Sequence, residues 1–120
     1  MDIVNIGEKF KLFQEQWSPK IVGELNGQYV KLAKLQGEFV WHSHEEEDEL
    51  FMVFQGKLTM HFREKTVVVN PGEFLIVPKG VEHLPVVEGE EVHLLLFEPK
   101  QTLHTGEVHH AKTDNDQQWL

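Results

Sequence analysis

Residues 37–56 read GEFVWHSHEEEDELFMVFQG and enclose two histidines and five consecutive acidic residues between two apolar runs. Both runs are rich in β-branched and aromatic residues, which are typical of strands. Because alternate side chains of a strand face the same side, a strand over residues 38–44 places Val40, His42 and His44 on one face. The pattern predicts two strands joined by an acidic turn.

The five acidic residues fall into two groups. In a strand over residues 49–55, Glu49 shares a face with Phe51 and Val53, whereas residues 45–48 are most simply a solvated turn. Histidines two apart on a strand have Cα atoms roughly 6 to 7 Å apart, so both imidazoles can converge on one ion. A carboxylate on the next strand completes such a site, although ordinary strand histidines also show the H-x-H spacing.

A third histidine follows in the stretch PGEFLIVPKGVEH, residues 71–83. Pro71-Gly72 predicts a turn, the apolar residues 74–77 a buried strand, and Pro78-Lys79-Gly80 a second turn. His83 then begins the next strand. Since the preceding turn is rigid, we expect the position of this histidine to be well defined.

Composition excludes several classes of function. The chain has 120 residues, which predicts one domain, and its net charge of -9 argues against nucleic-acid binding and against polybasic membrane contact. The single arginine, Arg63, limits forked recognition of phosphates, and the lack of cysteine excludes thiolate sites and disulfides. No apolar run approaches the roughly 20 residues of a membrane span, and no signal peptide is visible. We expect a soluble cytoplasmic protein.

The remaining chain predicts an all-β protein. Residues 8–17 carry three aromatic side chains at helical spacing, which indicates a short helix that anchors the core. Asn26-Gly27 lies between two apolar runs and predicts a tight hairpin turn. Several short strands separated by turn residues follow, which favours an antiparallel sandwich or barrel. The expected organisation is an N-terminal helix and hairpin start over 1–27, a β-barrel over 28–103 and a polar tail over 104–120.

The histidine-rich stretch resembles the first motif of the cupin family. That motif is glycine, five residues, H-x-H, three or four residues, glutamate, six residues and glycine. Here Gly37 precedes His42 by four residues instead of five, and Glu49 and Gly56 follow at the family spacing.

The later stretch resembles the second cupin motif. Gly72, Pro78-Lys79-Gly80 and His83 stand at the family spacings, and Val87 replaces the final asparagine. The whole pattern is similar to small single-domain bacterial cupins described as mannose-6-phosphate isomerase-like. The resemblance covers about residues 28–99. It implies an antiparallel jelly-roll β-barrel, usually a homodimer.

The resemblance also implies that one divalent metal ion is bound by His42, His44, Glu49 and His83. Asp48 lies at a spacing that the family allows, but the face that Glu49 shares with Phe51 favours Glu49. Three imidazoles and a carboxylate suit Mn, Fe, Co, Ni, Cu or Zn. Neither change in the motifs affects these four residues.

The barrel of such a protein is expected to hold a mostly apolar pocket for a small-molecule ligand. Its candidate residues are Val40, Phe51, Val53, Tyr29 and His93. Tyr29 is alternatively a packed core aromatic, and Phe74 and Ile76 are further candidates for pocket or core. The ligand set permits an oxygenase, an isomerase or a lyase. It also permits a non-enzymatic metal-binding or ligand-binding module, or a phosphosugar isomerase-like protein.

Overall fold

The computed structural model describes residues 1–102 and 117–120. One short helix is followed by seven strands: α1 (Ile6–Phe10), β1 (Lys20–Leu25), β2 (Gln28–Glu38), β3 (Glu49–Gln55), β4 (Leu58–Phe62), β5 (Thr66–Val69), β6 (Phe74–Val77) and β7 (His83–Pro99). All strand pairings between these elements are antiparallel, as expected for a jelly roll.

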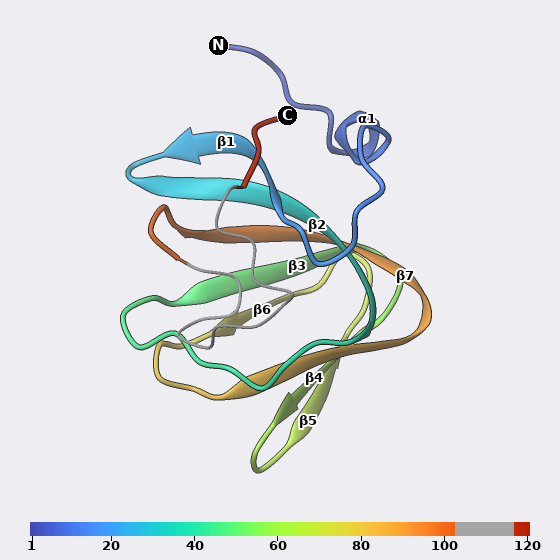
Figure 1. The fold of residues 1–120 in the computed structure, drawn as a ribbon, viewed down its shortest axis with the longest axis vertical. Coiled ribbons are helices and arrows are strands. Elements are labelled where there is room, and N and C mark those ends of the chain that lie inside the picture. The colour runs from blue at the N-terminus through green and yellow to red at the C-terminus, as the bar shows by residue number, and fades with distance from the viewer. Residues whose placement is uncertain (103–116) are drawn as a thin grey trace.

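The long strand β7 joins the two parts of the fold. Its second half pairs with β2 and β3 in the order β1-β2-β7-β3-β6, and its first half pairs with β4, which also pairs with β5. Figure 1 shows α1 and β1 at one end of the molecule and the β4–β5 hairpin at the other. The described strands curve around a common interior but do not close into a complete cylinder, since β6 and β1 are not paired.

The turn between β1 and β2 has the geometry that its sequence predicts. Asn26 and Gly27 both have positive φ angles, 50° and 76°, which is the requirement of a two-residue type I′ hairpin turn. β1 and β2 are therefore joined with a defined register, in which Leu25 is opposite Gln28. This register sets which side chains of β2 face the interior.

The apolar residues form two clusters on the two sides of the sheet. The larger cluster fills the interior and includes Leu35, Val53, Met60 and Leu94. The smaller cluster lies on the outside of β2, where α1 and the residues that follow it pack, and consists of Phe10, Phe13, Val22 and Leu32. The short helix therefore covers one outer part of the sheet and leaves the interior to the strands.

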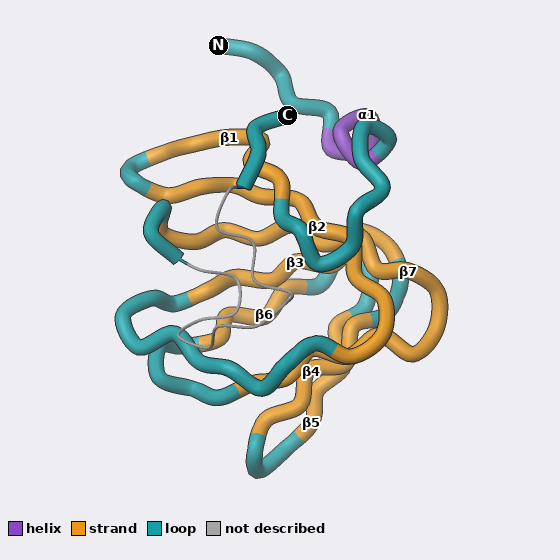
Figure 2. Tube along the Cα trace, in the orientation of Figure 1, coloured by secondary structure: helices purple, strands orange, loops and turns teal. Residues whose placement is uncertain are grey.

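The stretch that we expected to be a strand over residues 38–44 is largely not one. β2 ends at Glu38, and only His42 forms an isolated bridge. Figure 2 shows this stretch as part of the long loop between β2 and β3. A register shift lies between Leu35 and Gly37, and Gly37 has a φ of 78°. The pairing of β2 with β7 then continues as far as Glu38.

Two further expectations need correction. The helix predicted over residues 8–17 ends at Phe10, and Trp17 has a φ of 58°, which no helix allows. Phe74 and Ile76 are exposed on the outer face of β6, at 60% and 53%, and so belong to neither the pocket nor the core. Strand alternation identified the two faces of β6 but could not say which of them faces the interior.

The end of the chain returns to the sheet. The amide of Ile21 donates to the carbonyl of Gln118, and the amide of Leu120 donates to the carbonyl of Ile21. Of the tail predicted over 104–120, only 117–120 lies within the described residues. In the described part of the chain, no helix has the length and apolar character needed to span a membrane.

Gly56, the last glycine of the first motif, provides a test of the packing between β3 and β7. A Cβ atom there would lie 2.9 Å from the carbonyl oxygen of Glu91, and the residue has a φ of 85°. Gly72 has a φ of 84° but no atom within 4 Å of such a Cβ. We expect Gly56→Ala to lower the free energy of unfolding by about 3 kcal/mol, because the backbone strain of a positive φ adds to the overpacking against Glu91. Gly72→Ala should lower it by only about 1 kcal/mol, because only the backbone strain applies there. Urea denaturation measures both, and equal losses would contradict the role of the close contact.

Candidate metal centre

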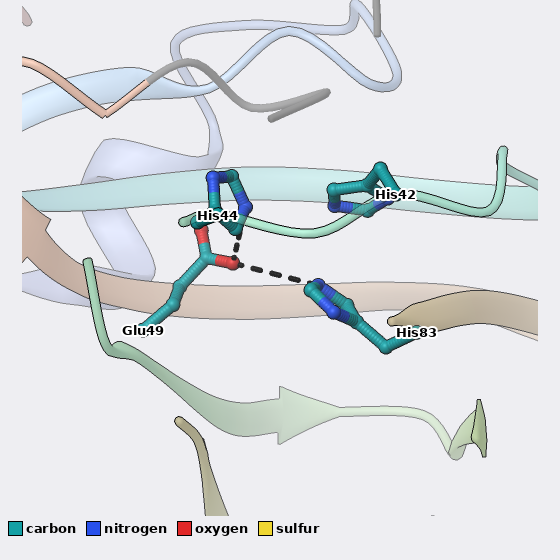
Figure 3. A group of neighbouring side chains, drawn as sticks. All are labelled: His42, His44, Glu49 and His83. Carbon is teal, nitrogen blue, oxygen red and sulfur yellow. Dashed lines mark ion pairs between the residues drawn. The ribbon is translucent and has the colours of Figure 1, made fainter. Parts of the chain in front are cut away.

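Four buried side chains from three segments meet at one place in the interior. His42 and His44 lie in the loop before β3, Glu49 begins β3 and His83 begins β7. One ligand atom from each residue lies within 4.8 Å of the others. Figure 3 shows His42 and His44 above Glu49 and His83, with Glu49 between the rings of His44 and His83. The four residues that the sequence singled out therefore form a single group.

Backbone hydrogen bonds hold the two histidine-bearing segments together. The amide of His42 donates to the carbonyl of His83 at 3.1 Å, and the amide of His83 donates to the carbonyl of His42 at 2.9 Å. The two imidazole rings consequently lie with their centroids 4.2 Å apart. The amide of Gly80 donates to the carbonyl of His44 at 2.8 Å, which ties the turn before His83 to the same loop.

Local hydrogen bonds define which ring nitrogen of each of these histidines carries the proton. Nδ1 of His42 donates to the carbonyl of Val40 at 2.8 Å, and Nδ1 of His83 donates to the carbonyl of Val81 at 2.9 Å. In a neutral ring the lone pair then lies on Nε2. Both rings thus have the backbone-anchored arrangement that is common for metal-binding histidines.

Two histidines of the group, His44 and His83, are neutral at physiological pH. Burial lowers the pKa of His83 from 6.5 to about 4 and also lowers the pKa of His44. Nε2 of His44 is 3.2 Å and Nε2 of His83 is 3.8 Å from Oε1 of Glu49 (Figure 3), but neutral rings form no ion pair with it. Ring nitrogens of His44 and His83 therefore face the carboxyl oxygen of Glu49.

This arrangement fits a cation. Within the described residues, Nε2 of His83, both ring nitrogens of His44 and Oε1 of Glu49 have no hydrogen-bond partner. A buried polar atom without a partner costs about 1 to 3 kcal/mol. One divalent ion would accept several of these lone pairs at once, and the donor set of imidazole and carboxylate suits a first-row transition metal. The group can therefore hold a metal ion.

The structure separates Glu49 from its acidic neighbour Asp48. Glu49 is buried in the group, and burial raises the pKa of its carboxyl. Asp48 is exposed, and its Oδ1 accepts a hydrogen bond of 2.9 Å from the amide of Lys79. Asp48 thus supports the turn before His83 and is not one of the four converging side chains.

A cavity adjoins the group. His42 and Glu49 contribute to its wall and are its only residues with polar side chains among those described, apart from the indole of Trp17. The rest of the wall is apolar, and the residues that line it are Trp17, Pro19, Ala33, Leu35, Phe39, Phe51, Pro85, Leu94 and Leu96. The site therefore presents two of its four side chains to a mostly apolar space.

Of the five pocket candidates, the cavity wall includes Phe51 alone. Val53 is fully buried in the interior cluster, and Val40 supplies its carbonyl to His42. Tyr29 packs edge-on against Trp119 at 5.6 Å. His93 faces outward, because it stacks on Phe10 at 4.5 Å and its neighbour Leu94 faces the cavity.

A buried ion pair that the sequence analysis missed borders the group. Nζ of Lys31 lies 2.8 Å from Oε1 of Glu98, and both side chains are almost completely buried. The register that pairs Leu50 with Phe97 places Glu98 opposite Glu49 one step further on. Burial raises the pKa of Glu98 well above its ordinary value, as does the charge of Glu49. The signal was strand parity, because Lys31 shares the inward face of β2 with Ala33 and Leu35.

Residues 28–98 match the family described as the cupin domain. A curated relative, the uncharacterized protein YdbB of Bacillus subtilis (strain 168), is 41% identical over 63 residues, which are 52% of this chain and 56% of that protein. The match thus spans little more than half of the curated relative.

Two solved structures extend the similarity over most of the chain. A cupin-2 domain containing protein from Shewanella frigidimarina NCIMB 400 is 42% identical, with a TM-score of 0.80, over 82% of this chain and 95% of that one. Protein NMB1881 from Neisseria meningitidis is 27% identical, with a TM-score of 0.74, over 82% of this chain and 100% of that one.

The neutral state of His83 predicts a pH dependence of stability. Between pH 6.5 and about 4 the unfolded chain takes up a proton at His83 that the folded protein does not, so acidification through this window destabilises the fold. We expect the metal-free protein to lose about 3 kcal/mol through this residue, relative to a His83→Gln variant, between these pH values. Urea unfolding of both proteins in the presence of a chelator measures the difference, and parallel pH profiles would contradict it.

Proposed function

The chain belongs to the cupin family, and from this premise we propose that it binds one divalent metal ion through His42, His44, Glu49 and His83 for chemistry on a small organic molecule. The observation that carries the proposal is the group of buried donor atoms without hydrogen-bond partners beside an apolar cavity. The metal is one of Mn, Fe, Co, Ni, Cu or Zn. The proposed location is the cytoplasm, which the composition supports.

The four side chains of the proposed site have two different roles. His44 and His83 are buried away from the cavity, where their neutral rings donate electron pairs to the ion. His42 and Glu49 reach the cavity wall, so a ligand in the cavity approaches the ion on their side. A divalent ion held there would supply Lewis-acid chemistry at a substrate oxygen or redox chemistry with O₂. The apolar wall excludes water from the reacting groups.

This arrangement supports an oxygenase, an isomerase or a lyase acting on a small molecule. A non-enzymatic module that only binds the metal or a ligand has the same donor set, and turnover is what distinguishes the two. Turnover that depends on the added metal supports the enzyme, whereas a ligand that raises the melting temperature without turnover supports the module.

A phosphosugar isomerase has the least support, because the basic side chains near the interior already have partners. Lys31 pairs with Glu98, and Nζ of Lys34 donates to the carbonyl of Phe13 at 2.6 Å. The guanidinium of Arg63 stacks on Trp41 at 3.8 Å and pairs with Glu82. Among the described residues, no basic side chain lines the cavity.

We also propose that the protein is a homodimer that associates through the outer face of β3 and β6. The N-terminal helix does not offer an apolar face for this contact, because Phe10 and Phe13 are buried within their own chain. The register of β3 and β6 places Met52 beside Phe74 and Leu50 beside Ile76 on the outer face. Large exposed apolar patches of this kind mark interaction surfaces.

The metal proposal is tested with two neighbouring carboxylates. We expect Glu49→Gln to weaken binding of Zn²⁺ or Mn²⁺ by more than the roughly 10- to 100-fold typical for loss of an outer-shell partner, because a ligand oxygen is lost. Asp48→Asn, the matched control, should bind like the unmodified protein. Titration of chelator-treated protein measures both affinities. Failure of the unmodified protein to take up any of the six metals would refute the proposal.

The dimer proposal is tested by placing a charge on the outer face. Ile76→Glu should produce a monomer with unchanged metal content, because a carboxylate would be buried in the contact. Val68→Glu is the control, since Val68 is an exposed apolar residue on β5, outside the proposed surface. Sedimentation at micromolar concentration measures the state of all three proteins. A monomeric unmodified protein, or a monomeric Val68→Glu variant, would contradict the assignment.

A further inference from the structure

Trp17 occupies an unusual position in the N-terminal segment, outside the residues that match the cupin domain. Its φ is 58°, a left-handed conformation that is a real outlier for a bulky residue and costs about 1 to 3 kcal/mol. Such strain persists only where the surroundings enforce it.

Two hydrogen bonds to β2 hold Trp17 in this conformation. Its backbone amide donates to the carbonyl of Lys34 at 2.9 Å, and its indole Nε1 donates to the carbonyl of Gln36 at 2.9 Å. The indole N–H is thereby directed to the backbone of β2, and the ring presents apolar surface to the cavity. Trp17 is thus fixed as part of the cavity wall and is not simply a helix residue that anchors the core.

The indole stacks on a second ring that also lines the cavity. Trp17 and Phe39 are stacked, with centroids 4.4 Å apart and planes within 8° of parallel. Phe39 in turn meets the ring of His42 edge-on at 5.4 Å. A row of rings therefore leads from the N-terminal segment to a residue of the metal group, along one side of the cavity.

The cavity offers polar contacts at one end only. With the indole N–H bonded to Gln36, only His42 and Glu49 among the described lining residues present a polar side chain, and no lysine or arginine lines the space. A ligand with several hydroxyl groups or a phosphate would bury polar groups without partners, at about 1 to 3 kcal/mol each. A flat ring matches the aromatic wall, and a single polar substituent matches the metal end.

We propose that the cavity selects a small, uncharged, flat molecule, such as an aromatic ring with one hydroxyl group, and that Trp17 is a specificity-determining residue. This inference rests on the proposed function only in that the polar end of the ligand faces the metal group. The ring of the ligand lies against the stacked pair of Trp17 and Phe39. Of these two residues, only Phe39 lies within the cupin domain match.

The experiment uses phenol as the probe, with cyclohexanol and glucose 6-phosphate for comparison, on zinc-loaded and on chelator-treated protein. Calorimetry should show phenol binding more tightly than either comparison compound. Trp17→Ala should weaken phenol binding roughly tenfold, since an aromatic contact and its buried area are lost, and Trp17→Phe should weaken it by less than about threefold. Trp41→Phe is the control, because Trp41 stacks on Arg63 and does not line the cavity.

A second measurement covers the case in which Trp17→Ala does not fold. The three tryptophans allow a Trp41→Phe/Trp119→Phe variant in which Trp17 is the sole tryptophan, and phenol should change its fluorescence with the affinity found by calorimetry. No change in fluorescence, equal phenol affinity in the folded Trp17→Ala variant, or tighter binding of glucose 6-phosphate would overturn the inference.

The comparison of zinc-loaded with chelator-treated protein separates this inference from the proposed function. If chelator-treated protein binds phenol through Trp17 but takes up no metal, the proposed function fails and the inference stands. If the protein takes up metal but binds no phenol in either form, the inference fails and the metal proposal stands.

Discussion

The reciprocal backbone hydrogen bonds between His42 and His83 are the interaction on which the candidate site depends. The two residues are far apart in sequence, and one of them lies in a loop that has already left β2. Pairing their backbones places two imidazoles side by side, and each ring is oriented by a hydrogen bond to the carbonyl two residues before it. Together with the hydrogen bond from the amide of Phe39 to the carbonyl of Pro85, this bridge fixes the loop between β2 and β3 against β7.

The group formed in this way is unfavourable when nothing is bound. Burial lowers the pKa values of His44 and His83 and raises that of Glu49, and their buried nitrogen and carboxyl oxygen atoms are brought together without hydrogen-bond partners. The adjacent pair of Lys31 and Glu98 adds two buried charges to the same region. Buried ion pairs seldom increase stability over an apolar core, because desolvation offsets the attraction. The stability of the fold therefore rests on the apolar clusters, and a bound cation would relieve the cost at the site.

The two faces of the sheet have different roles in this protein. The inner face carries the metal group and the apolar cavity, and its wall is completed by the strained residue Trp17. Part of the outer face is covered by α1, and the part on β3 and β6 remains exposed with large apolar side chains. The proposed metal chemistry and the proposed association thus lie on opposite faces of a single layer of strands.

The sequence by itself determined the antiparallel β-class and the hairpin at Asn26-Gly27, and its resemblance to the cupin motifs indicated the four residues that converge. These features rest on local rules, because turn chemistry and the spacing of motif residues are read along the chain. Tertiary structure decided the rest. Alternation could not tell which face of β6 points inward, and it placed residues 38–44 in a strand although the chain leaves the sheet there. The distinction between Phe51 in the cavity wall and Val53 behind it, and the position of Trp17, depend on contacts between segments distant in sequence, which no local pattern encodes.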